Sequence, residues 1–127
     1  MIDLQVFELA HRQIIIDLTI RTLERDRKHI DNLKMKSSFD LWMDRSIKEM
    51  KEILKDIKSQ LSRKGIKFQQ EKVDGEFTVY TFLDKGKVFE RRYNNVALKN
   101  WCCEEVKRLL GLEYRTIQDG KNPPPSR

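Results

Sequence analysis

The sequence predicts an α+β fold of the order ααβββα, in which two helices, a three-stranded antiparallel meander and a last helix pack as helices on one sheet. Two observations carry this prediction. Apolar residues recur at three- and four-residue steps up to residue 61, and the period then changes to two. The turn sequences Asp74-Gly75 and Asp84-Lys85-Gly86 divide the second region into three strands.

The first predicted helix, from Asp3 to about Arg27, has two apolar rows. The first row consists of Leu4, Phe7, His11, Ile14 and Leu18, and the second of Leu9, Ile16, Ile20 and Leu23. Two rows are more than a single packing face needs, so the helix is either central to the core or meets a second subunit. The second row is therefore the candidate interface for self-association or for a protein partner.

The second predicted helix follows a polar connection at residues 26–36, and Ser37 and Asp40 are expected to form a capping box at its start. Its apolar residues alternate in four- and three-residue steps, as in a coiled-coil seam. They are Met43, Ile47, Met50, Leu54, Ile57 and Leu61. Gly65 ends the helix. The seam is met either by another subunit or by the first helix in an antiparallel hairpin.

The C-terminal half is predicted to hold the meander and one more helix. The strands are expected at Ile66–Val73, Glu76–Leu83 and Lys87–Tyr93. Asn94 or Asn95 can cap a helix that runs to about Leu110. Residues 1–114 are thus predicted to form one domain, and residues 115–127, which are polar and rich in proline, a disordered tail.

The composition predicts a cytoplasmic protein with a positive surface. The 26 Lys and Arg exceed the 20 Asp and Glu, and the excess begins in the second helical stretch. Such a balance permits contact with nucleic acid, although a solvated lysine coat gives the same composition. The chain opens without the pattern of a secretory signal, and its longest apolar run, Ile14-Ile15-Ile16, excludes a membrane span. Two adjacent cysteines, Cys102 and Cys103, do not suit a disulfide framework.

Motifs of catalysis, of metal binding and of cofactor binding are missing from the sequence, which predicts a protein that is not an enzyme and has no small-molecule substrate. It contains no Cys-x-x-Cys, no His-x-x-x-His and no glycine-rich phosphate loop. His11 is expected to be a packed residue with one satisfied ring nitrogen. The crowded Glu71, Lys72, Asp74 and Glu76 at the first hairpin keep a small enzyme as the third hypothesis.

Basic side chains carry the alternative hypothesis, a nucleic-acid interface. The candidates are Lys48, Lys51, Lys55 and Lys58 along the second helix, Lys85 at the second hairpin, and Arg91 and Arg92 on the third strand. The strand aromatics Tyr80, Phe82, Phe89 and Tyr93 could stack on bases or could belong to the core. Glu49, Glu52 and Asp56 dilute the lysine stripe, as a solvated helix face would also require.

The stretch from Ile47 to Leu110 resembles double-stranded-RNA-binding domains in its order of helix, three antiparallel strands and helix. Cys102-Cys103 fall where that family carries two small residues. The sequence departs from the family at Asn94-Asn95-Val96-Ala97, where a lysine-rich helix start is expected, and in having no histidine near the first hairpin. The resemblance therefore concerns the order of the elements.

The leading hypothesis is a non-catalytic binding or regulatory protein that forms a homodimer or binds a protein partner through its helices.

Overall fold

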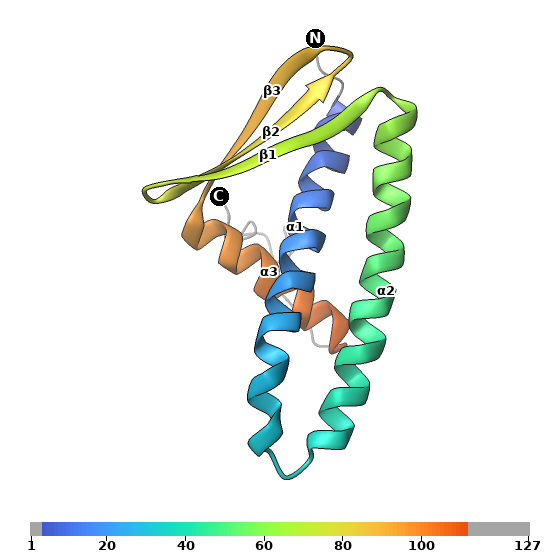
Figure 1. The fold of residues 1–127 in the computed structure, drawn as a ribbon, viewed down its shortest axis with the longest axis vertical. Coiled ribbons are helices and arrows are strands. Elements are labelled where there is room, and N and C mark those ends of the chain that lie inside the picture. The colour runs from blue at the N-terminus through green and yellow to red at the C-terminus, as the bar shows by residue number, and fades with distance from the viewer. Residues whose placement is uncertain (1–3, 112–127) are drawn as a thin grey trace, which may run out of the picture.

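A computed structural model describes residues 4–111 of the chain. Its elements are α1 (Leu4–Asp26), the 3-10 helix η1 (Arg27–Asn32), α2 (Lys36–Arg63), β1 (Ile66–Asp74), β2 (Phe77–Asp84), β3 (Lys87–Asn94) and α3 (Asn95–Leu109). The predicted α+β class and the ααβββα order are confirmed. Two long helices, α1 and α2, form an antiparallel hairpin, and the sheet lies at one end of it (Figure 1). The helix α3 crosses α1. The predicted tail at 115–127 lies outside the described residues.

The helical hairpin buries the seam of α2 inside the chain. All six seam residues, from Met43 to Leu61, are buried in one hydrophobic core. The seam is therefore met by α1, as the hairpin alternative predicted. Within residues 4–111, no helix has the combination of length and apolar character that a bilayer crossing requires.

The second apolar row of α1 belongs to the same core, and this corrects the predicted interface. Ile16, Ile20 and Leu23 are buried, with exposed fractions of 0%, 4% and 6%, and the half-buried Leu9 packs against the same core. The reason is that α1 contacts α2 along one side and α3 along another, so both of its apolar rows have partners within the chain. A second subunit is not needed to cover them.

Of the two predicted helix caps, one is confirmed and one is wrong. The Asn94 side chain accepts a hydrogen bond of 2.8 Å from the Val96 N–H at the start of α3. The helix α2 begins at Lys36, and its N-cap residue Met35 makes no side-chain bond. The predicted partner of Ser37, Asp40, instead accepts a hydrogen bond of 2.9 Å from Lys36 Nζ. This bond holds the pKa of the Asp40 carboxyl below its ordinary value.

The three strands form the predicted antiparallel meander in the order β1-β2-β3. An irregularity between Phe68 and Gln70 interrupts the pairing of β1 with β2. Phe82 stands opposite both Phe68 and Phe89, and this row faces the helices, since Phe89 contacts Phe7 of α1 edge to face at 5.7 Å. The buried face of the sheet thus joins its aromatic side chains to the helical core.

The end of α2 is fixed to the β2–β3 turn at Gly65. The backbone of Gly65 has φ +80°, a conformation that glycine adopts readily and other residues rarely adopt. Its carbonyl oxygen accepts a hydrogen bond of 3.1 Å from the Lys85 N–H. A Cβ on Gly65 would lie 2.9 Å from Lys85 Cγ, which is closer than carbon atoms pack. This contact brings Lys85 to the end of α2.

The substitution Gly65→Ala is expected to lower the free energy of unfolding by about 1–2 kcal/mol, because it adds both a strained backbone and a steric contact. Urea denaturation measures the loss. Gly75→Ala is the matched control, since Gly75 has φ +61° but nothing lies within 4 Å of its added Cβ. Equal losses in the two variants would contradict the constraint from Lys85.

Candidate functional site

A cluster of cations, which we call the basic end, lies where α2 stops beside the β2–β3 turn. It consists of Lys58, Arg63, Lys64, Lys67, Lys85 and Lys87. All are exposed except the half-buried Lys64. Lys85 is held here by its bond to Gly65, and Lys58 and Lys67 line one open cleft of about 570 Å³. Three separate segments of the chain thus place positive charge on one surface.

The cations of the basic end form no ion pairs with the described side chains, although Asp84 lies among them, opposite Lys87 in the β2–β3 register. None of the six cations forms an ion pair with a carboxylate of residues 4–111, and the Arg63 Nε donates only to the Ser59 carbonyl oxygen. At the opposite end of the helical hairpin, Arg27 pairs with Asp40 and Asp44, and Lys36 pairs with Asp40, whereas Lys28 and Lys34 form no ion pair with the described side chains. The net +6 charge of the chain is therefore concentrated, in part, at the basic end.

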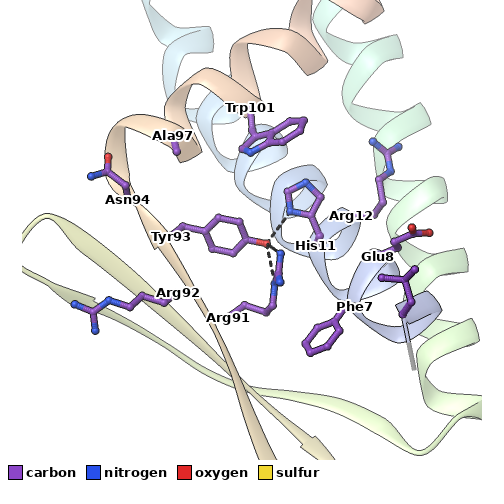
Figure 2. Close-up of a pocket in the computed structure, with 11 residues that line it drawn as sticks. Phe7, Glu8, His11, Arg12, Arg91, Arg92, Tyr93, Asn94, Ala97 and Trp101 are labelled. Atoms are coloured by element: carbon purple, nitrogen blue, oxygen red, sulfur yellow. Dashed lines mark hydrogen bonds between the residues drawn. The ribbon is translucent and has the colours of Figure 1, made fainter. Parts of the chain in front are cut away.

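A second candidate site is an open pocket of about 660 Å³ between α1, β3 and α3 (Figure 2). We call it the arginine pocket, and its principal residues are Phe7, His11, Arg12, Arg91, Tyr93 and Trp101. The rings of Trp101 and His11 meet edge to face at 4.9 Å, and those of His11 and Tyr93 stack at 5.6 Å. The pocket therefore combines aromatic walls with guanidinium groups.

The hydroxyl of Tyr93 is the centre of the hydrogen bonding in this pocket. It accepts from Arg91 Nε at 3.3 Å and from Arg91 Nη2 at 3.2 Å, and it lies 2.7 Å from His11 Nδ1 (Figure 2). A guanidinium can only donate, so the tyrosine's own hydrogen goes to His11 Nδ1. His11 is then neutral, with its proton on Nε2. The expectation of a packed histidine with a satisfied nitrogen is confirmed.

The electrostatics of the pocket agree with a neutral histidine. Burial first, and then the charges of Arg91 and Arg12, lower the pKa of His11 to about 4. Burial also raises the pKa of the Tyr93 hydroxyl above its ordinary value. Both groups are therefore uncharged at neutral pH, and the charge of the pocket is set by its arginines.

The guanidinium of Arg91 is one of two cations of the lining, with Arg92, that pair with no carboxylate of the described residues. It lies 5.4 Å from the ring centroid of Phe7 and 5.3 Å from that of Tyr93. Arg12, in contrast, donates to Glu105 Oε1 at 2.5 Å. Glu8 also lines the pocket, exposed, without bonding to Arg91. An anion entering the pocket would find Arg91 free to pair.

The predicted nucleic-acid residues do not form one interface. Lys58 and Lys85 lie at the basic end, whereas Lys48, Lys51 and Lys55 line a groove with the acidic Glu24, Asp44 and Glu52. Lys51 forms an ion pair of 3.1 Å with Glu24. This corrects the prediction, because acids contributed by α1 and by α2 itself offset the first part of the stripe.

Arg91 and Arg92 are also separated from the basic end. They stand near the far end of β3, where Arg91 enters the arginine pocket and Arg92 lies 4.4 Å from the ring centroid of Phe77. The aromatic residues proposed for base stacking are corrected too. Tyr80, Phe82 and Tyr93 are buried, and Phe89 is stacked on Phe82 at 5.2 Å. The core, and not the surface, uses these rings.

The acidic hairpin does not assemble a catalytic site. Glu71 forms an ion pair of 2.9 Å with Arg21 of α1, while Lys72, its neighbour along the strand, stands on the opposite face of the sheet. Over the part of the chain that the structure describes, no three residues of the metal-binding types gather closely enough to hold an ion. The arrangement of side chains at this hairpin therefore does not support the hypothesis of a small enzyme.

Several residues of both sites were missed from the sequence. Arg63, Lys64 and Lys67 lie within five residues of one another around Gly65, a local signal that could have been used. The arginine pocket left no such signal, because His11 and Tyr93 are 82 residues apart and both resemble core residues. The pocket forms only when α1 packs on β3, and this packing is not visible in the sequence.

The fold defines a small α+β protein with two candidate sites. The family model described as YhjD protein matches residues 1–114, so the chain belongs to this family. A curated relative from Bacillus subtilis strain 168, with the name uncharacterized protein YhjD, is 26% identical over 108 residues, which cover 84% of this chain and 87% of the relative. No solved structure matches the chain.

Proposed function

We propose that this chain is a non-catalytic cytoplasmic protein that binds double-stranded nucleic acid at its basic end. One observation carries the proposal: six cations from the end of α2 and the residue after it, from β1, and from the β2–β3 turn and the start of β3 lie together, and none forms an ion pair with a carboxylate of the described residues. A phosphate backbone requires such a surface and little more. Self-association through Leu9, Ile16, Ile20 and Leu23 is not part of the proposal, because these residues pack in the core.

The described surface favours a duplex over a single strand. Proteins that bind single strands use exposed aromatic rings as stacking platforms. The aromatic ring nearest the basic end, Phe68, is 39% exposed, but it is a single ring that packs on Phe82 at 5.5 Å and on Tyr80 at 6.4 Å, so it does not offer successive bases a series of rings. Binding at the basic end would therefore rely on phosphate contacts, which carry no sequence information. The affinity should be similar for duplexes of different sequence and should fall steeply with salt.

The position of the basic end differs from that of the lysine-rich helix start in double-stranded-RNA-binding domains. The helix α3 starts after Asn94, which stands opposite Phe77 in the strand register, whereas Lys87 of the basic end stands opposite Asp84 at the other end of the same strands. The proposal therefore rests on the charges of this surface, and the resemblance in element order contributes nothing to it.

The triple substitution Lys58→Glu, Lys67→Glu and Lys85→Glu is expected to weaken duplex binding at least tenfold at about 100 mM salt, because it reverses half of the basic end. The slope of log K against log salt should also become shallower by about 3, at roughly 0.9 for each lost phosphate contact. Fluorescence anisotropy with labelled 20-base-pair DNA and RNA duplexes, and with single strands of the same sequence, measures both quantities.

The matched control is Lys28→Glu, Lys34→Glu and Lys99→Glu, three exposed residues away from the basic end whose reversal changes the net charge equally. This variant should lose much less affinity. Equal losses in the two variants would show that net charge alone attracts the duplex, and the located interface would then be wrong. Duplex binding that is absent even at low salt would overturn the function itself, and stronger binding of single strands would overturn the choice of duplex.

A further inference from the structure

We propose that the arginine pocket binds a small planar organic acid, with its carboxylate on Arg91 and its flat apolar part against the ring of Phe7, whose centroid lies 5.4 Å from the guanidinium. This site is independent of the basic end. The two lie at opposite ends of β3, since Lys87 begins the strand at the basic end and the pocket is lined by Arg91 and Tyr93 near its other end.

The hydrogen bonds of Arg91 leave the part of the guanidinium that recognises carboxylates. Tyr93 Oη accepts from Nε and Nη2, which together form the side edge of the group. The end fork, made of Nη1 and the second N–H of Nη2, has no protein acceptor among the described contacts. A carboxylate binds such a fork through two parallel hydrogen bonds, which add both strength and geometric selectivity.

The surroundings hold the guanidinium in place before a ligand arrives. The guanidinium lies 5.4 Å from the ring centroid of Phe7 and 5.3 Å from that of Tyr93, and its side edge is bonded to a hydroxyl that is itself bonded to His11. Little side-chain entropy is therefore lost on binding. The half-buried position of Arg91 also weakens the screening of its charge by water.

The charge of the pocket favours a carboxylate over a phosphate dianion. Arg12 is already paired with Glu105, and the neutral His11 adds no charge. The exposed Glu8 of the lining offsets one of the two remaining cations, Arg91 and Arg92, so the pocket carries one unbalanced positive charge beside the rings. Arg92 lies over Phe77. One guanidinium fork matches one carboxylate. The aromatic walls and the volume of about 660 Å³ then suit a planar organic acid of modest size.

Indole-3-carboxylate and benzoate are suitable probes, with indole-3-carboxamide and benzamide as uncharged partners of the same shape. Amide NMR titration of the full chain is expected to show saturable shifts at residues of the arginine pocket, with dissociation constants of about 1 mM or tighter for at least one acid. The carboxamides should bind at least tenfold more weakly. Equal binding of acid and amide, or shifts located elsewhere, would overturn the proposal, as would the absence of saturable shifts.

Variants then test the role of Arg91. Arg91→Gln should weaken binding of the acid at least tenfold, and Arg91→Lys should also weaken it, because lysine keeps the charge but lacks the fork. The substitution Lys99→Gln, at an exposed residue of α3, removes one charge outside the pocket and should retain the affinity.

A thermal melt checks that each variant is folded, and Arg91→Lys keeps the test valid if Arg91→Gln is unstable. Full acid binding by folded Arg91→Lys would contradict the fork. Duplex binding should not change in either Arg91 variant, so the two proposals can fail separately.

Discussion

Lowering the pH from 7 to 4 is expected to remove about 2–3 kcal/mol from the free energy of unfolding, through His11 alone. The pKa of His11 is lowered from 6.5 to about 4 in the folded protein, by burial first and then by Arg91 and Arg12, while Glu105 acts in the opposite direction. Between pH 6.5 and about pH 4, His11 of the unfolded chain binds a proton that His11 of the folded chain does not. The stabilisation is therefore complete above pH 6.5, falls with pH, and is lost below about pH 4.

Urea denaturation at pH 7, 5.5 and 4 measures this loss, and His11→Asn identifies its source. Asparagine can offer an oxygen to the Tyr93 hydroxyl and does not titrate, so this variant should be less stable at pH 7 but should show a shallower dependence on pH. His29→Asn is the control, since His29 is exposed in η1. An unchanged pH dependence in His11→Asn would mean that other groups cause the acid sensitivity.

Truncation of Ile16 is expected to produce the second large effect. Ile16→Ala should cost about 2–5 kcal/mol, because the side chain is 0% exposed and lies where α1 is covered by the rest of the chain. Urea denaturation at two protein concentrations measures both the loss and its origin. The midpoint should be the same at both concentrations, since Ile16 packs within one chain.

Leu4→Ala is the control for this experiment, since Leu4 lies in the same helix and is 70% exposed. It should change the free energy of unfolding by less than about 1 kcal/mol. A small effect of Ile16→Ala, together with a midpoint that depends on protein concentration, would instead restore the predicted subunit interface at this row.

The sequence was sufficient to predict the elements because their signals are local. The heptad seam from Met43 to Leu61 and the turns at Gly75 and Gly86 depend on spacing and on single residues with special backbone freedom. The predicted cap at Ser37 failed because Asp40 bonds to Lys36 and pairs with Arg27, a competition that spacing does not reveal. The seam alone also left open whether its partner was α1 or another subunit.

The candidate sites were harder to predict because each joins distant segments. Lys58 and Lys85 were both candidates, but only the bond between Lys85 and Gly65 brings them to one surface. Arg91 was expected on a nucleic-acid interface and lies instead beside Tyr93. These contacts cannot be read from charge counts or periodicity, because one forms where the end of α2 meets the β2–β3 turn and the other where α1 packs on β3.

The connection between α3 and α1 has a consequence for the order of folding. Helix α1 pairs with α2, and each strand pairs with the next, so these contacts join neighbouring elements of the chain. The docking of α3 on α1 instead links residues as far apart as Arg12 and Glu105, which are separated by 93 positions. Forming a contact of this span costs more loop-closure entropy than forming a contact between neighbouring elements. We therefore expect α3 to dock late during refolding, and its amide hydrogens to exchange with solvent earlier than those at the centre of α1.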